Sequence, residues 1–164
     1  MSHRTSILLK GAKSLGAKAV DVLIEDGAIA DIGSKLSSAT PDSTIDCAGL
    51  VLLPGLVDLH THLREPGRED AETVQSGTRA AALGGFTAVH AMANTSPVAD
   101  TAGVAEQVWR LGLEHGHADV RPVGAVTLGL AGEKLAELGA MAESPAAVRV
   151  FSDDGKCVSD AVLM

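Results

Sequence analysis

The chain has 164 residues, of which 46% are hydrophobic and 21% charged, and its formal net charge is -8 at pH 7. This acidic balance disfavours nucleic acid and anionic membrane surfaces as partners. The longest apolar run, near residues 50–57, falls far short of the roughly 20 residues that a membrane-spanning helix needs. The first residues lack the apolar core of a secretory signal, and two cysteines, Cys47 and Cys157, do not suggest a disulfide framework. We therefore expect a cytoplasmic protein.

Residues 1–49 are expected to form a small β-sandwich-like domain. Alternating segments at residues 6–10, 19–24 and 28–32 predict strands, and residues 44–46 predict a further short edge. Between the second and third segments, Glu25-Asp26-Gly27 is typical of a hairpin turn. No residue in this part of the sequence points to chemistry.

From about residue 50 the sequence alternates between predicted strands and helices. The expected strands are residues 49–60, divided at Pro54-Gly55, then 86–92, 119–127 and 147–151. The expected helices are residues 71–83 with Asp70 as N-cap and Gly84-Gly85 as stop, 100 or 101 to about 114, 133–141, and a last one that begins near Gly155.

This alternation predicts an α/β fold with parallel strands and helical crossovers. Polar residues follow the first, second and fourth predicted strands, and in a (β/α)8 barrel that edge carries the active site. No glycine-rich phosphate loop follows a strand, which disfavours a nucleotide-binding open sheet. We expect residues 50–164 to form four βα units of a TIM-type (β/α)8 barrel, that is, half of such a barrel.

Two histidines at the end of the first barrel strand form the clearest candidate site. In a strand, residues i and i+2 point to the same face, so His60 and His62 project side by side. Neutral imidazole is the commonest metal ligand, and a single strand that supplies two of them fixes their separation. A pair of satisfied core histidines is the alternative, which the charged neighbours Asp58 and Arg64 make less attractive. We predict that His60 and His62 bind a metal ion.

A second histidine pair has the same spacing but a different setting. His115 and His117 flank Gly116 at a predicted helix end, where glycine is typical of a cap and histidine favours the helix dipole. We expect this pair on the face opposite the site. His90 lies inside a predicted strand and is interpreted as a core or interface residue.

Four further residues are candidates for the site: Arg64, Asn94, and Asp153 or Asp154. Arg64 offers a planar fork for a substrate carboxylate, although an Arg64–Glu65 ion pair in a turn is the alternative. Asn94 fits either a turn cap or a substrate hydrogen bond. Asp153 and Asp154 are adjacent, so on an extended backbone only one of them would reach the metal and the other would point away.

Several motifs together resemble the amidohydrolase superfamily and, within it, the bacterial type I dihydroorotases. The matching stretches are residues 54–67 (PGLVDLHTHLREPG), 84–88 (GGFTA), 92–100 (MANTSPVAD) and 151–155 (FSDDG). The resemblance covers essentially the whole chain, and the combination of HxHxREPG with NTxPV is highly specific. It implies a zinc-dependent enzyme of pyrimidine biosynthesis that reversibly cyclises N-carbamoyl-L-aspartate to L-dihydroorotate.

The resemblance also implies roles for individual residues. His60 and His62 would bind the more buried of two zinc ions, and an aspartate of FSDDG, with Asp154 favoured over Asp153, would bridge the two ions. His62, Arg64 and Asn94 would contact the substrate, with Arg64 and Asn94 on its carboxylate. Allantoinases usually carry asparagine at the position of Arg64, and hydantoinases carry lysine near position 154, so both fit less well.

The family also needs two more histidines and an aspartate, the general acid/base, from later strands, whereas this sequence ends at Met164. We therefore expect an N-terminal fragment, inactive alone, with open strand edges that favour association, for instance as a homo-oligomer. The alternatives are a non-catalytic scaffold for aspartate transcarbamoylase and another cyclic amidase, an allantoinase or hydantoinase.

Overall fold

The computed structural model describes residues 5–36 and 40–164. Its backbone contacts divide the chain into two compact units, Met1–Pro54 and Gly55–Met164. The first unit extends past residue 49, the end expected from the sequence, because a short strand at Val51–Leu52 pairs with the first strand.

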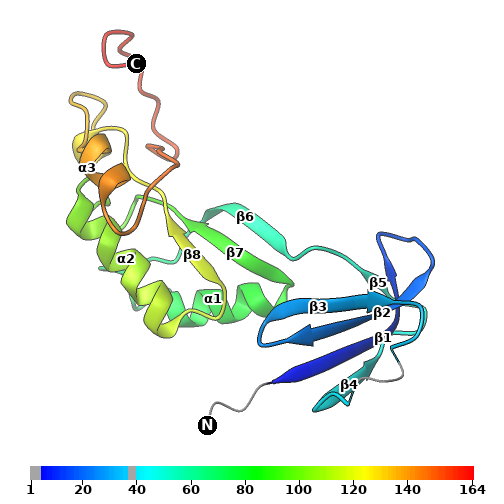
Figure 1. The fold of residues 1–164 in the computed structure, drawn as a ribbon. Helices are drawn as coiled ribbons and strands as arrows, with labels where there is room; N and C mark the ends of the chain where they lie inside the picture. Colours follow the sequence, from blue (N-terminus) through cyan, green and yellow to red (C-terminus); the bar gives the residue numbers. More distant parts are fainter. Residues whose placement is uncertain (1–4, 37–39) are drawn as a thin grey trace. The chain divides into compact units, whose positions relative to one another are not determined.

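The described part of the first unit is one five-stranded sheet (Figure 1). Its strands are β1 (Ser6–Ser14), β2 (Ala19–Glu25), β3 (Ala28–Gly33), β4 (Ser43–Asp46) and β5 (Val51–Leu52). They follow the order β3-β2-β1-β4, and β5 also pairs with β1. Because β4 and β5 pair one after the other along β1, they extend this sheet and do not form the second layer of a sandwich.

The predicted hairpin between β2 and β3 is confirmed. Asp26 and Gly27 have φ angles of 50° and 79°, the left-handed pair that a type I′ turn requires.

Asp21 on β2 connects β1 with the segment that follows β3. Its buried carboxylate accepts the backbone N–H of Leu36 (3.1 Å) and of Gly11 (2.9 Å), and these two bonds, that from Leu36 first, lower the pKa of Asp21.

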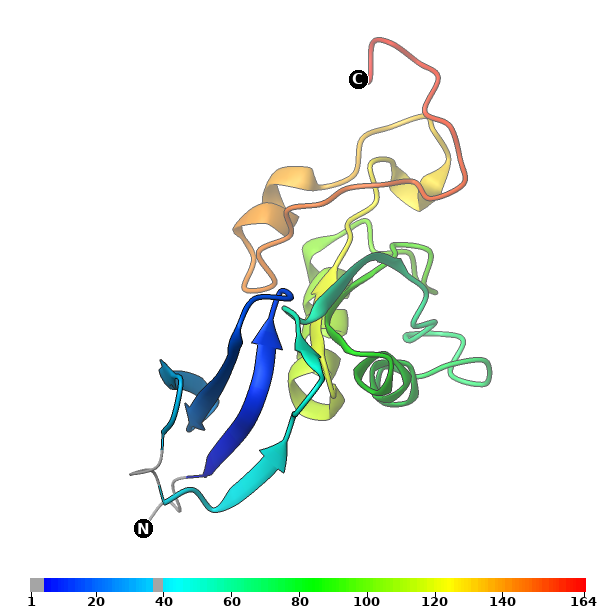
Figure 2. The ribbon, with the colours of Figure 1, turned by 90° about the vertical axis from the view of Figure 1, so that its right-hand side faces the viewer.

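The second unit is built on a parallel sheet in the order β6-β7-β8. Its elements are β6 (Leu56–Thr61), α1 (Val74–Leu83), β7 (Phe86–Ala91), α2 (Ala102–His115), β8 (Asp119–Pro122), the 3-10 turn η1 (Leu128–Leu130) and α3 (Leu138–Glu143). Figures 1 and 2 show α1 and α2 on the same side of this sheet. The predicted strand–helix–strand alternation is thus confirmed through β8.

The core of this unit lies between the sheet and the two helices. The buried side chains that form it are Leu63, Val74, Val89, Ala91, Val108 and Val120. Gly112 on α2 allows the close approach to β8, because a Cβ at that position would lie 2.5 Å from the Cβ of Val120. The core therefore fixes β6, β7 and β8 side by side, with the ends of β6 and β7 available for a site.

The first turn of α1 differs from the prediction. Thr73, not Asp70, is the N-cap, and it forms a capping box with Ser76 in which each side chain accepts the backbone N–H of the other residue. The carboxylate of Glu65 also accepts the backbone N–H of Val74 (2.8 Å). Two side chains thus satisfy N–H groups that would otherwise have no partner at the helix start, and Asp70 is not needed there.

Replacing Thr73 with alanine is expected to lower the free energy of unfolding by about 1 kcal/mol, because the capping hydrogen bond is lost. The matched control is Thr101→Ala, since Thr101 is the N-cap of α2 but makes no side-chain capping bond. Thermal unfolding of the full-length variants measures both effects. Equal losses at the two positions would show that the capping box adds nothing.

The segment after β8 departs most from the sequence-based prediction. Residues 147–151 do not form a regular fourth strand: the pairing is a single bridge between Gly124 and Phe151. β8 ends at Pro122, which has no N–H to donate. A cavity of about 290 Å³ lies beside it and is lined by His90, Arg121, Pro122 and residues 146–150.

The helix predicted over residues 133–141 is shorter than expected, and the helix predicted to begin near Gly155 is absent from the described residues. Residues 133–141 do not form one helix, because Leu135 forms an antiparallel bridge with Thr127 and α3 begins only at Leu138. After Gly155 the chain forms no helix: it has a bend at residue 156, no regular structure over residues 157–160 and a turn over residues 161–163. Most helical stability comes from packing an apolar face, and Val162 and Met164 are exposed in this segment.

The β6 strand is less buried than its apolar sequence suggests. Leu56, Val57 and Leu59 are 49%, 53% and 64% exposed. The prediction of a buried strand is wrong for these side chains because, among the described residues, β6 is an edge strand with β7 as its single neighbour.

The described residues contain no helix that is long and apolar enough to cross a membrane.

Candidate metal centre

The two histidines of the HxH motif lie side by side, as the strand geometry predicts. His60 is in β6 and His62 follows the strand directly. Their ring centroids are 5.1 Å apart, with the ring planes at 70° to each other. The side chain of His60 is 56% exposed and that of His62 is 30% exposed, so both rings remain accessible to a ligand.

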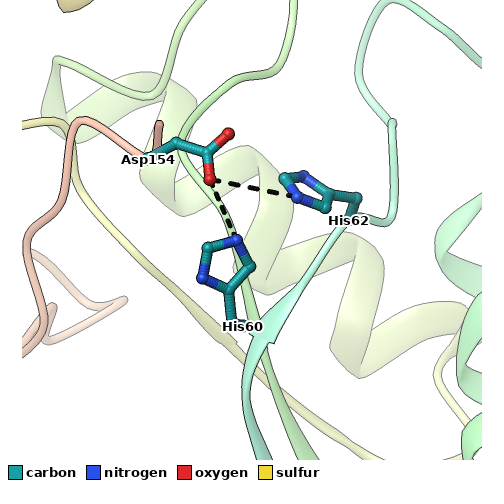
Figure 3. Close-up of side chains that lie close together, drawn as sticks. All are labelled: His60, His62 and Asp154. Atoms are coloured by element: carbon teal, nitrogen blue, oxygen red, sulfur yellow. Dashed lines mark ion pairs between the residues drawn. The ribbon is translucent and has the colours of Figure 1, made fainter. Parts of the chain in front are cut away.

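Asp154 completes the cluster from a distant part of the sequence (Figure 3). Its Oδ1 lies 2.9 Å from His60 Nε2 and 4.0 Å from His62 Nε2. One potential ligand atom from each of the three residues lies within 4.8 Å of the other two. Strand alternation left the choice between Asp153 and Asp154 open and the resemblance favoured Asp154, which is the residue that the structure brings to the histidines.

This donor set fits a zinc ion. Zinc prefers nitrogen and oxygen ligands at about 2.0–2.2 Å in tetrahedral arrangement, which places neighbouring ligand atoms about 3.4 Å apart. The two distances of 2.9 and 4.0 Å between Asp154 Oδ1 and the imidazole nitrogens lie on either side of that value. Small side-chain rotations would therefore be enough for the three residues to share one ion.

Asp153 is buried and bonds to the backbone, whereas Asp154 faces the histidines. It is only 4% exposed, and its carboxylate accepts the backbone N–H groups of Val126 (2.8 Å) and Thr127 (3.0 Å) as well as the Thr127 hydroxyl. Asp154 adopts a left-handed φ of 57° directly after it. Asp153 thus ties the Ser152–Gly155 turn to the segment after β8, while the turn aims Asp154 at the histidines.

The sequence left open whether Asn94 caps a turn or bonds to the substrate. In the structure Asn94 connects two members of the cluster, His62 and Asp154. Its Oδ1 is 3.0 Å from Nδ1 of His62, and its Nδ2 donates to Oδ2 of Asp154 at 2.8 Å. Asn94 lies in the loop after β7, so the centre draws on the end of β6, the loop after β7 and the turn that follows the bridge between Gly124 and Phe151. The side chain acts within the cluster and does not cap a turn.

Arg64 lies two residues beyond His62 with a left-handed φ of 62° and a half-buried side chain. No hydrogen bond or ion pair holds its guanidinium in the part of the chain that the structure describes. The alternative, an ion pair with Glu65, is not found there either, because the Glu65 carboxylate accepts the N–H of Val74 at the start of α1. The guanidinium thus has its donors available for an anion.

The loops that follow β6 and β7 are packed tightly against each other. The backbone N–H of Ser96 donates to the carbonyl of Pro66 (2.9 Å). At Gly67 the φ is 99°, and a Cβ would lie 2.0 Å from the carbonyl oxygen of Ser96, so only glycine fits. The N–H of Gly67 also donates to Glu69 (2.7 Å) and lowers the pKa of that carboxyl. This contact fixes the loop of Arg64 relative to that of Asn94.

The other histidines among the described residues, His90, His115 and His117, lie outside this cluster. His115 is the last residue of α2 and lies 3.8 Å from Glu114, and the backbone N–H of His117 donates to Thr78 on α1. His90 is half-buried, and its Nδ1 has no hydrogen-bond partner among the described residues. These positions agree with the prediction that the second histidine pair is not part of the site.

Sequence reasoning missed the supporting roles of Asp153 and Glu65. For Asp153 the adjacency of two aspartates was a signal that one of them would bond elsewhere, but it did not show which one. For Glu65 there was none, because its partner Val74 lies beyond an irregular loop whose course the sequence does not reveal.

Residues 49–164 match the family model described as dihydro-orotase-like. The chain is 66% identical over 157 residues to a dihydroorotase of Streptomyces coelicolor, covering 96% of this chain and 36% of the relative. It is 63% identical over 164 residues to one of Leifsonia xyli subsp. xyli, covering 100% of this chain and 37% of the relative. The chain therefore spans little more than a third of the length of these curated relatives.

Solved structures agree on the fold. A dihydropyrimidinase from Brevibacillus agri is 29% identical, with a TM-score of 0.61 over 75% of this chain and 28% of that protein. An L-hydantoinase from Arthrobacter aurescens is 24% identical, with a TM-score of 0.68 over 76% of this chain and 29% of that protein. The predicted α/β class, the first part of an amidohydrolase barrel, is confirmed. With residues 49–164 matched to one family, the chain belongs to the dihydroorotase-like family of amidohydrolases.

Proposed function

We propose that this chain supplies the N-terminal part of a zinc-dependent dihydroorotase, which reversibly cyclises N-carbamoyl-L-aspartate to L-dihydroorotate in pyrimidine biosynthesis. The observation that carries the proposal is the convergence of His60, His62 and Asp154, with Arg64 two residues after His62 in the sequence. The names of the relatives support it, because dihydroorotases match the chain over nearly its whole length.

His60, His62 and Asp154 would hold the metal, with two zinc ions in the complete site and Asp154 shared between them. When bound, zinc lowers the pKa of water and polarises the ring amide carbonyl. His62 and Asp154 are held by Asn94, so these two ligands are preorganised. The general acid/base, an aspartate, is expected beyond residue 164.

Arg64 would determine which cyclic amides are accepted. Dihydroorotate carries a carboxylate, which the planar guanidinium can bind through two parallel hydrogen bonds. Asn94 and His62 would complete the contacts to the substrate. Dihydrouracil, hydantoin and allantoin have no such carboxylate, so the cyclic-amidase alternatives do not explain an unpaired arginine beside the metal ligands.

The test is a substrate panel for the full-length natural protein, with Arg64→Met as the variant. We expect turnover of dihydroorotate and little or none of dihydrouracil, hydantoin or allantoin. In Arg64→Met, KM for dihydroorotate should rise at least about tenfold, since a charge-assisted pair contributes about 1.5–3 kcal/mol, while the zinc content stays the same. An unchanged KM would remove Arg64 from the substrate site, and turnover of a neutral amide alone would refute the proposed substrate.

A scaffold for aspartate transcarbamoylase is the remaining alternative. A protein that only binds a partner has no need for three converging metal ligands, and here all three are present. We therefore propose an active enzyme located in the cytoplasm, with association with aspartate transcarbamoylase or with further copies of the chain as additional properties.

A further inference from the structure

The amide of Asn94 contacts two of the three metal ligands at once. Its Oδ1 lies 3.0 Å from His62 Nδ1, and its Nδ2 donates to Asp154 Oδ2 at 2.8 Å. The opposite amide orientation would place the amide oxygen against a carboxylate oxygen, where neither atom can donate. The chemistry of the contacts therefore fixes the orientation: the carbonyl faces His62 and the NH₂ faces Asp154.

This orientation determines the tautomer of His62. An amide oxygen only accepts, so the shared hydrogen must lie on Nδ1 of the ring. Neutral His62 then has its lone pair on Nε2, which is the nitrogen that lies 4.0 Å from Asp154 Oδ1. Without an acceptor at Nδ1, the proton could occupy Nε2 and block the metal-binding atom.

The same amide also gives the two oxygens of the Asp154 carboxylate different partners. Oδ2 receives the Asn94 hydrogen bond, whereas Oδ1 lies 2.9 Å from His60 Nε2. Rotation of the carboxylate about its last torsion angle would cost this hydrogen bond. Oδ1 is thus kept on the side of the two imidazoles.

We infer that Asn94 is a positioning residue of the metal centre, which keeps Nε2 of His62 free of a proton and Oδ1 of Asp154 directed at the metal. The inference rests on the metal-binding part of the proposed function. It adds to the proposed contact with the substrate carboxylate and does not replace it, because one N–H and one oxygen lone pair of the amide remain unused by these bonds.

The first measurement needs no variant. In metal-free full-length protein labelled with ¹⁵N-histidine, the neutral form of the His62 ring should carry its proton on Nδ1 and none on Nε2. His115, which is half exposed and lies outside the site, serves as the reference ring in the same spectrum. A neutral His62 ring with its proton on Nε2 would overturn the inference.

The second measurement is zinc affinity, by competition with a chelating indicator. Asn94→Ala and the bulkier Asn94→Leu should both bind zinc about 10–100-fold more weakly, which is the usual effect of losing a group that orients a ligand, and His62 should become a mixture of tautomers. Arg64→Met, which does not contact the ligands, should bind zinc normally. Zinc affinity within twofold of the natural protein in both Asn94 variants would contradict the inference.

These readouts separate this inference from the proposed enzyme activity. Weaker zinc binding in the Asn94 variants of a protein that does not convert dihydroorotate would support the positioning role and refute the substrate. Normal zinc binding with a higher KM for dihydroorotate would leave the enzyme proposal intact and reduce Asn94 to a substrate ligand.

Discussion

Asp154→Ala in the full-length protein is expected to weaken zinc binding and dihydroorotate turnover by well over a hundredfold. Loss of a group that merely orients a ligand costs about 10–100-fold, and Asp154 is itself a ligand candidate whose Oδ1 lies 2.9 Å from His60 Nε2. The variant also loses the single carboxylate in the described cluster. Zinc content by atomic absorption and steady-state kinetics on the same sample measure both effects.

Two controls isolate the metal from the fold. Asp160→Asn changes an exposed aspartate of the C-terminal segment, whose carboxylate accepts the N–H of Val162 and no further hydrogen bond among the described residues, and should leave zinc binding unchanged. His60→Ala and His62→Ala should reproduce the Asp154 phenotype, while His115→Ala and His117→Ala, with the same spacing, should not. Normal zinc content in Asp154→Ala would exclude the carboxylate from the centre.

The neighbouring replacement, Asp153→Ala, is expected to lower the free energy of unfolding by about 3 kcal/mol or more, because a buried donor left without a partner costs about 1–3 kcal/mol. Three donors depend on this carboxylate: the N–H groups of Val126 and Thr127 and the Thr127 hydroxyl. Urea unfolding of the zinc-free full-length protein measures the loss.

The two aspartates should therefore give opposite phenotypes although they are adjacent. Asp154→Ala should unfold like the natural protein when both are free of zinc, whereas Asp153→Ala should be unstable with or without the metal. Asp153→Asn is the milder variant, since its amide oxygen can still accept the two backbone N–H groups. Unchanged stability of Asp153→Ala would mean that the turn does not depend on this anchor.

Strand periodicity was enough to predict the pairing of His60 and His62, because the two-residue repeat of a strand is independent of the rest of the fold. The same rule could not choose between Asp153 and Asp154. These residues lie in a turn with a left-handed φ at Asp154, where side-chain direction does not alternate. The choice depends on the partners of Asp153, which lie 26 and 27 residues away along the chain.

The errors in secondary structure share a cause. Residues 133–141 have helical character, but the bridge of Leu135 to Thr127 uses part of this segment. The predicted strand over residues 147–151 retains a single bridge to Gly124. In both places long-range contacts decide the conformation, and local propensity carries no information on them. The strands and helices through β8 were predicted because glycine stops and the periodicity of apolar residues can be read within each segment.

The most direct test of a zinc-dependent dihydroorotase is the return of activity when zinc is added to the metal-free, full-length protein. Zinc content and dihydroorotate hydrolysis are measured in the same samples, with His60→Ala as the control. We expect turnover to rise in proportion to bound zinc in the natural protein and to stay absent in the variant. Full hydrolysis without zinc, or a zinc-loaded protein that leaves dihydroorotate unchanged, would contradict it.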